Sequence, residues 1–216
     1  MIKRINVMLL IVLLIMLPGV SLAQDDYPET RRVTVDSDAG SMSIIVPDGW
    51  QALITPEEVG NYGSMTNRVR VPEGEARTEI QIIFRNVAEL LSVLDSPVDT
   101  AAENPAYDYL SKYTVWSGNE GRGVYNTPLA LESNGIPAAL MLYVEHTDAP
   151  RFGADVDVVL SLSLAFYLGN DSMLIMLLDG PVDESEGLLS LWVDVLQTVE
   201  INDEALAFIG DLSDLL

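Results

Sequence analysis

The 216-residue sequence contains no cysteine and a single histidine, His146. Without cysteine the chain has no disulfides, and the common zinc sites and histidine-based catalytic triads lack the residues they need. The sequence also has no glycine-rich phosphate-binding loop and no Gly-x-Ser-x-Gly motif. The absences remove the common zinc, nucleotide-binding and serine-hydrolase sites from consideration.

Basic residues are scarce. The chain has 33 Asp and Glu but only 11 Lys and Arg, a net charge of −22, and Lys112 is the only lysine after Lys3. Such a surface repels nucleic acid and anionic lipid and favours cations or basic partners. Acidity also keeps an exported protein soluble in a salty medium, where screening removes most self-repulsion. Solubility is the simpler interpretation of the charge.

The N-terminus has the pattern of a signal peptide. Lys3 and Arg4 precede an apolar run over residues 7–17, Pro18 and Gly19 end that run, and residues 21–23 (Ser-Leu-Ala) offer small residues to a signal peptidase. The run is too short to span a bilayer, which takes roughly 20 residues. An uncleaved amphipathic anchor is the alternative, whereas a lipoprotein anchor is excluded because no cysteine follows.

Cleavage after Ala23 would leave 193 of the 216 residues and move the net charge from −22 to −24, because two of the 11 basic residues are removed. That length suits one domain with its own core. The predicted organisation is a signal peptide (residues 1–23), a flexible leader (24–30), a single α+β domain (31–201) and an acidic C-terminal tail (202–216). The expected location is extracytoplasmic, either periplasmic or secreted.

The stretch around which the domain is predicted to form spans residues 156–200. Even-numbered residues from Val158 to Leu168 are all apolar and odd-numbered ones are mixed, which is typical of a strand with one buried face. Residues 169–171 (Gly-Asn-Asp) favour a tight turn. Residues 172–178 are apolar at nearly every position and therefore predict a central strand, followed by an acidic loop from Asp179.

A helix is predicted after this hairpin. Asp183 and Glu186 have the spacing of a reciprocal helix cap, and the helix that follows has a broad apolar face. The residues of that face are Leu188, Leu189, Leu191, Trp192, Val195 and Leu196. Burying them should stabilise the fold by several kcal/mol, at roughly 25 cal/mol per Å².

Turn signals divide the rest of the chain. Predicted strands cover residues 31–36, 41–46, 51–54, 78–85, 128–132 and 136–146, with one edge strand within 62–75. A short helix is predicted to begin at residues 55–58, and residues 88–94 are either a short helix or an extended crossing. A further helix is expected to start at Ser96 and Pro97, to kink or split at Pro105, and to end near Tyr113. Asn134-Gly135 is the strongest hairpin signal.

Mostly hairpin-joined strands with helices interposed mid-chain and last predict an α+β domain: a central antiparallel sheet covered by helices. The order resembles the PsbP-like fold, named for the extrinsic protein of the photosynthetic oxygen-evolving complex. The resemblance rests on residues 43–50, which end in Pro-x-Gly-Trp, on residues 80–102 and on residues 157–199. It spans most of residues 31–201 and implies an α/β/α sandwich with a non-catalytic, assembly or binding role. It transfers no functional residue, because the matching positions are structural, and it does not imply attachment to a photosystem.

Acidic clusters are the remaining candidates for chemistry. Asp36, Asp38 and Gly40 resemble half of a calcium loop, but the third acid and the distant Glu are missing, so a solvated turn is the better interpretation. A second group could meet at one end of the sheet and bind calcium weakly, although caps and exposed turns explain the same acids. Its members are Asp155, Asp157, Asp179, Asp183, Glu184 and Glu186.

His146 stands at a strand end beside Glu145 and Asp148, where an ordinary surface role is expected. The densest aromatic group is Tyr107, Tyr109, Tyr113 and Trp116; core packing is the simpler interpretation, and a binding groove lined by rings is the alternative. Met173 and Met176 are expected to fill the core.

The sequence therefore predicts an exported, soluble, non-enzymatic binding or assembly module with no catalytic, cofactor-binding or metal-binding residues and no cofactor. Its expected partner is a protein or a small apolar ligand, and nucleic acid is not expected. Two alternatives stay open. The first is a secreted hydrolase that uses paired carboxylates or a carboxylate-bound metal, and the second is a carrier of a small apolar molecule.

Overall fold

The computed structural model describes residues 30–47, 51–55, 58–59, 62–63, 65–70, 78–90, 94, 96–119, 123–146 and 158–206. The expected signal peptide and leader, Trp50 and its turn, Asp148, Asp155, Asp157 and the last ten residues of the tail lie outside these ranges. No helix in the described ranges combines the length and apolar character needed to cross a membrane.

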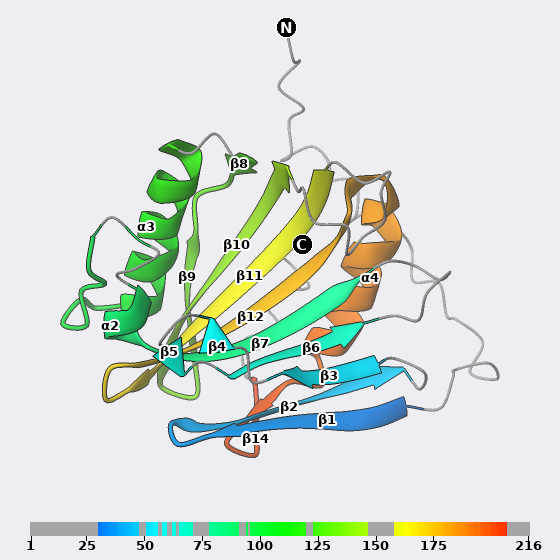
Figure 1. The fold of residues 1–216 in the computed structure, drawn as a ribbon, viewed down its shortest axis with the longest axis horizontal. Helices are drawn as coiled ribbons and strands as arrows, with labels where there is room; N and C mark the ends of the chain where they lie inside the picture. Colours follow the sequence, from blue (N-terminus) through cyan, green and yellow to red (C-terminus); the bar gives the residue numbers. More distant parts are fainter. Residues whose placement is uncertain are drawn as a thin grey trace, which may run out of the picture.

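An eight-stranded antiparallel sheet forms the centre of the molecule (Figure 1). Its order is β3-β6-β7-β12-β11-β10-β8, and β9 also pairs with β10. The strands are β3 Gln51–Thr55, β6 Met65–Arg70, β7 Glu79–Asn86, β8 Gly123–Tyr125, β9 Leu129–Ser133, β10 Ile136–His146, β11 Val158–Gly169 and β12 Ser172–Pro181. The predicted hairpin of β11 and β12 is confirmed, and β12 is central, because it pairs with both β7 and β11.

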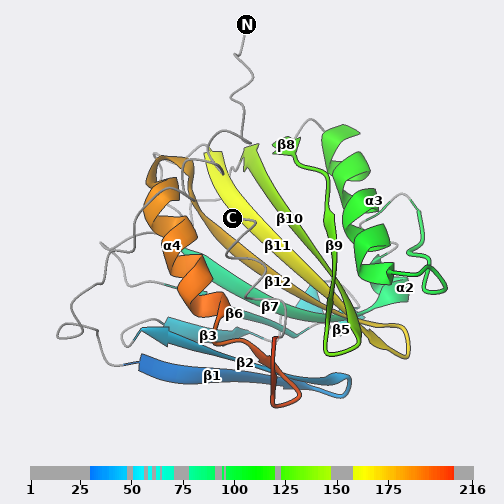
Figure 2. The ribbon, with the colours of Figure 1, turned by 180° about the vertical axis from the view of Figure 1, so that it is seen from behind.

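A second sheet of order β1-β2-β13-β14 packs beside the first. It joins β1 Thr30–Ser37 and β2 Gly40–Pro47 to β13 Glu200–Ile201 and β14 Glu204–Ala205. Seen from behind, α4 and the β13–β14 hairpin lie next to the β1–β2 hairpin (Figure 2). Arg32 of β1 hydrogen-bonds Glu200 of β13, and that bond lowers the pKa of Glu200. The two ends of the described chain thus meet in one sheet.

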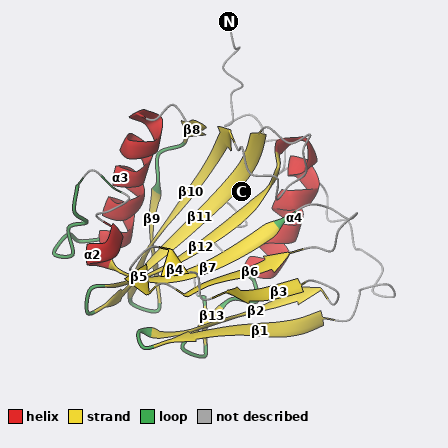
Figure 3. Ribbon diagram, in the orientation of Figure 1, coloured by secondary structure: helices red, strands yellow, loops and turns green. Residues whose placement is uncertain are grey.

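Alternation along the central strands creates two separate cores. The even-numbered side chains of β7, β10, β11 and β12 face α4 Ser185–Leu196 and the small sheet, whereas the odd-numbered ones face α2 Val87–Leu90 and α3 Pro105–Asn119. Helices therefore flank both faces of the large sheet (Figure 3). The predicted α+β sandwich is confirmed, with helices on both sides and the small sheet added on the α4 side.

The α3 helix begins later than predicted. It starts at Pro105 rather than at Ser96, and it runs to Asn119 rather than ending near Tyr113. Pro105 occupies the first helical turn, where its missing N–H is not needed, so it starts the helix instead of kinking it. Asn104 caps the helix, because its Oδ1 accepts a hydrogen bond from Tyr107 N at 3.0 Å.

Other local predictions are corrected as well. Glu58 and Val59 form β4, which pairs with β5 Tyr62–Gly63, so the helix expected from residues 55–58 is wrong. The strand expected within residues 62–75 exists as β6, yet it lies between β3 and β7 and is not an edge. Asp183 lies inside a 3-10 turn, η2 Val182–Glu184, that precedes α4, and the cap of this turn is Pro181 without a side-chain hydrogen bond.

Helix α4 is anchored by a buried tryptophan. Trp192 is fully buried, and its indole Nε1 donates to Thr78 Oγ1 at 3.2 Å. Thr78 in turn donates to the main-chain oxygen of Asp179 at 2.9 Å. Gly180 lies under the same helix: a Cβ added there would stand 2.4 Å from Leu188 Cδ1. The absence of a side chain at residue 180 therefore lets α4 approach β12.

Replacing Gly180 with alanine should destabilise the fold by about 1–3 kcal/mol, because the new methyl group overpacks against the buried Leu188. Urea unfolding should show a lower midpoint with an unchanged slope. Gly187→Ala is the matched control: nothing lies within 4 Å of a Cβ there, and an exposed helical Gly→Ala change stabilises by up to about 1 kcal/mol. An equal shift of the urea midpoint in Gly180→Ala and Gly187→Ala would contradict the close contact between residue 180 and Leu188.

Candidate functional site

A row of polar side chains crosses the α3-side face of the large sheet. Tyr143, Ser161, Asp179 and Glu79 hold successive register positions on β10, β11, β12 and β7. Directly opposed residues on neighbouring strands have adjacent side chains. All four are buried, and the two carboxylates are only 2% and 1% exposed at Asp179 and Glu79. The structure thus brings two acids together inside a face that is otherwise largely apolar.

Buried carboxylates are stable only when other groups hydrogen-bond them or balance their charge. Gln81 Nε2 donates to Asp179 Oδ2 at 3.3 Å. This hydrogen bond links β7 to β12 inside the enclosed row.

Four tyrosines continue the row toward the sheet border. Tyr109 and Tyr113 lie one turn apart on α3, while Tyr125 of β8 and Tyr143 of β10 stand opposite each other in register. Tyr125 and Tyr143 stack with ring centroids 5.0 Å apart, and Tyr113 lies 6.2 Å from each of them. The Tyr125 hydroxyl donates to Glu145 Oε2 at 3.4 Å. The rings pack against one another and fill the space between α3 and the sheet.

Burial is the main cause of raised pKa values in this tyrosine cluster. It raises the pKa of Tyr109 to about 12, against a small lowering by Arg85. Burial also raises the pKa of Tyr113 and of Tyr143, and for Tyr143 the charges of Asp179 and Glu145 add to the increase. Burial thus favours the neutral hydroxyl over the charged tyrosinate at all three positions.

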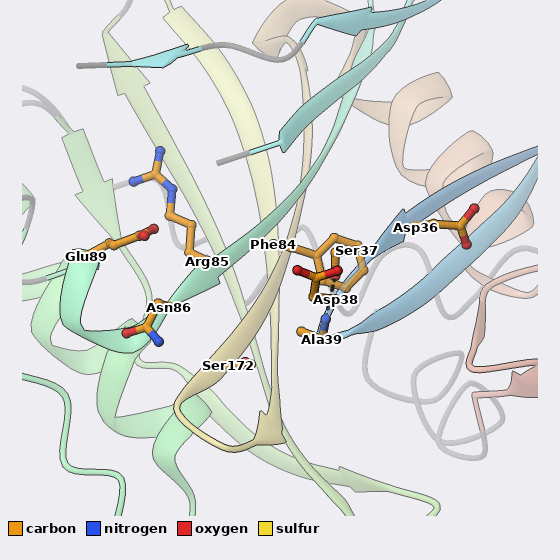
Figure 4. A pocket seen from close by; sticks show the side chains of 9 residues that line it. All are labelled: Asp36, Ser37, Asp38, Ala39, Phe84, Arg85, Asn86, Glu89 and Ser172. Carbon is orange, nitrogen blue, oxygen red and sulfur yellow. Dashed lines mark hydrogen bonds between the residues drawn. The ribbon is translucent and has the colours of Figure 1, made fainter. Parts of the chain in front are cut away.

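An open groove of about 660 Å³ lies between the β1–β2 turn and the end of β7. Figure 4 shows Arg85 and Glu89 on one side of it, with Ser37, Asp38 and Phe84 on the other. The turn is held internally, because Ser37 Oγ accepts a hydrogen bond from Ala39 N at 3.1 Å. The lining mixes polar and charged side chains with Phe84 and Ala39, and the groove is open to solvent.

Among the predicted acidic candidates, the structure describes the side chains of Asp36, Asp38, Asp179 and Asp183, whereas those of Asp155, Asp157, Glu184 and Glu186 lie outside the described set. Asp36 and Asp38 lie exposed at the β1–β2 turn, as expected of a solvated turn. Asp179 belongs to β12, which extends to Pro181, so its assignment to an acidic loop is wrong. Asp183 is exposed in η2. No group of three or more potential metal ligands occurs in the described part of the chain.

The remaining candidates lie where packing places them. His146 is exposed at the end of β10. Met173 and Met176 are both fully buried and point into opposite cores, as expected of core filling. Tyr107 is half-buried beside the α3-side core, and the side chain of Trp116 is outside the described set.

Sequence reasoning missed the Glu79–Asp179 pair and the contribution of Tyr125 and Tyr143. A signal was present: Glu79, Gln81 and Asp179 are polar residues inside or next to strongly apolar strand segments. These residues meet only because β7 pairs with β12. Gln81 and Asp179, for example, are 98 residues apart in the sequence. Strand pairing at this distance is not encoded in local periodicity.

Comparison with known proteins was informative only at the level of structure. No protein-family model matches the sequence, and no curated protein sequence does so either. The solution structure of cyanobacterial PsbP (CyanoP) from Synechocystis sp. PCC 6803 superposes with a TM-score of 0.53, covering 84% of this chain and 97% of that one, at 13% identity. The chain has the PsbP-like fold.

Two other solved structures are similar to this PsbP-like chain. LpqN of Mycobacterium tuberculosis, described as involved in cell envelope biogenesis, has a TM-score of 0.44 at 12% identity and covers 85% of this chain and 99% of that one. The Ran-binding protein Mog1p of Saccharomyces cerevisiae has a TM-score of 0.43 at 12% identity, with 81% and 97% covered. Identities this low extend the likeness to the fold alone.

The tyrosine cluster predicts a loss of stability in alkali. An unfolded tyrosine has a pKa near 10, so between about pH 10 and 12 the unfolded chain releases the Tyr109 proton while the folded chain keeps it. Tyr109 alone should therefore lower the free energy of unfolding by about 2–3 kcal/mol as the pH rises through this range. Urea titrations at several pH values should show that the free energy of unfolding falls less steeply with pH in Tyr109→Phe than in the wild type. Tyr107→Phe, on the same helix, is the control and should behave as wild type.

Proposed function

We propose that the protein is an exported, non-enzymatic module that binds or assembles with a protein partner. The observation that carries this proposal is the PsbP-like fold, which extends over 84% of this chain and 97% of cyanobacterial PsbP. The family resemblance in the sequence implies the same kind of role. The acidic chain, with a net charge of −22, favours a partner with a basic surface.

The position of the acids supports a non-catalytic role. A hydrolytic carboxylate pair has to face a pocket that admits substrate. Here Glu79 and Asp179 are 1% and 2% exposed within the sheet, and Gln81 hydrogen-bonds Asp179. The pair is nonetheless the one feature that favours the hydrolase alternative, since two acids do converge.

Substitution of the pair tests the hydrolase alternative. Glu79→Gln and Asp179→Asn keep the side-chain volume but remove both carboxyl groups, so partner binding should persist while the stability of the fold changes. Hydrolysis of a panel of ester, glycoside and phosphate substrates by the wild type, abolished in a folded double variant, would establish an enzyme and overturn the proposal.

Export is tested by the mature N-terminus. The full-length chain, produced in a bacterium with a general secretion pathway, should be recovered outside the cytoplasm with Gln24 as its first residue. An Ala23→Lys variant should remain uncleaved, because the peptidase requires a small residue there. Full-length protein retained in the cytoplasm would contradict export while leaving the binding role to be tested separately.

Partner binding is tested by crosslinking the tagged protein in its producing cells, followed by reconstitution with the purified candidate partner. We expect a fixed stoichiometry, such as one to one, and binding that persists in moderate salt. An exported acidic protein of similar net charge is the control for simple charge attraction. If every crosslinked species is shared with that control, the binding role is wrong.

A further inference from the structure

One border of the large sheet is formed by β8 and β9, which both pair with β10 and with no other described strand. Asn126 N, between the two strands, donates to Leu142 O at 3.3 Å, so residues 123–133 follow β10 as one interrupted strand. Figure 2 shows β9 at this border, next to α3. A strand at such a border has main-chain groups that face away from the sheet.

The turn between β9 and β10 determines which groups face outward. Asn134 and Gly135 have φ values of 52° and 76°, the pattern of a two-residue type I′ hairpin, and Ser133 stands opposite Ile136. The residues flanking such a turn form a hydrogen-bonded pair, and bonded and non-bonded pairs then alternate. Ala130 and Glu132 are therefore at non-bonded positions, with N–H and C=O directed away from β10.

Two further observations agree with this assignment. Pro137, which has no N–H, stands opposite Glu132, where no ladder hydrogen bond is expected. Asn104 Nδ2 donates to the carbonyls of both Leu131 and Ala138, at 3.1 and 2.8 Å, and these two residues form a bonded pair. Asn104 thereby fixes β9 to β10 and to the start of α3, which leaves the outer side of β9 preformed.

The side chains of this border alternate in character. Val124 and Leu129, on the α4 side, are 71% and 37% exposed, and they are two of the four large apolar side chains that stand exposed among the described residues. Ala130 and the acidic Glu132, on the α3 side, are exposed as well. An incoming strand would meet apolar groups on one side and a carboxylate on the other.

We propose that the β9 edge, residues 129–133 together with Val124, accepts an extended segment of a protein partner as an additional antiparallel or parallel strand. The segment alternates apolar residues, which cover Val124 and Leu129, with basic residues, which face Glu132. A second copy of this chain is the less suitable occupant, because each copy carries a net charge of −22. The inference rests on the proposed binding function and names the surface that performs it.

The added ladder is short. Within residues 129–133 the outward main-chain groups are the N–H and C=O of Ala130 and Glu132, and Pro128, the next residue of the same parity, adds a C=O but no N–H. Recognition of a strand at an edge takes its affinity from main-chain hydrogen bonds and its specificity from alternate side chains. A short, weakly held segment with strict alternation is thus the expected ligand.

The test uses a labelled seven-residue peptide of alternating lysine and valine, with binding to the purified mature protein followed by fluorescence anisotropy. A peptide of the same composition in block order and an alternating glutamate–valine peptide are the controls. We expect saturable binding of the alternating basic peptide only, with changes in amide NMR signals centred on Ala130 and Glu132. Equal binding of the block peptide would reduce the effect to charge attraction and overturn the proposal.

Variants locate the site. Ala130→Pro removes one outward N–H without removing a hydrogen bond to β10, and it should weaken peptide binding about tenfold or more. Ala130→Val keeps the N–H and is the matched control, expected to bind as wild type. The Glu132→Lys variant should no longer bind the lysine–valine peptide and should bind the glutamate–valine peptide instead. Wild-type affinity for Ala130→Pro, with no exchange of preference for Glu132→Lys, would contradict the edge as the site.

Two further outcomes distinguish the identity of the bound strand from the proposed binding function. If sedimentation shows a dimer that Ala130→Pro dissociates, the occupant is a second copy and the basic-segment proposal is wrong. If a reconstituted partner binds wild type and Ala130→Pro alike, the edge is wrong while the binding function stands.

Discussion

The structure depends on one constraint: β12 must be apolar on both faces because it supports two cores at once. Its even-numbered residues lie under α4 and its odd-numbered residues under α2 and α3. The strand is hydrogen-bonded on both edges, to β7 and to β11, so no part of it can move to solvent without breaking both layers. Two residues near the end of β12 do not have apolar side chains. Asp179 accepts a hydrogen bond from Gln81 in the polar row, and Gly180 leaves room for Leu188 of α4.

Local pattern predicted much of this architecture. The alternation from Val158 to Leu168, the Asn134-Gly135 turn and the apolar face around Trp192 each specify their element through a few neighbouring residues, and each is confirmed. The exceptions involve proline and short polar segments. Pro105 is read equally well as a kink or as a helix start, and only the Asn104 cap decides between them. Residues 55–58 (Thr-Pro-Glu-Glu) have the composition of a helix start, yet Glu58 and Val59 pair with β5 and form a strand.

The polar groups were harder to predict, because their meaning depends on register between distant strands. Glu79 and Asp179 lie far apart in sequence and meet only once β7 and β12 pair. The same holds for the tyrosines, of which two belong to α3 and two to the sheet. Of the acids selected from the sequence, Asp36, Asp38 and Asp183 stand at or beside turns. Asp179 instead lies inside β12 and meets Glu79, which local pattern did not single out. The hydrogen bond from Gln81 to Asp179 links two of these strands inside the sheet.

The small sheet has a consequence for how the chain reaches its folded state. Its first hairpin, β1–β2, comes from the beginning of the described chain, and the strand that pairs with it, β13, comes from the end. β2 can pair with β1 early in synthesis, but its second neighbour, β13, is available only after residue 201 has left the ribosome. The small sheet is therefore completed only when the described chain is almost fully synthesised.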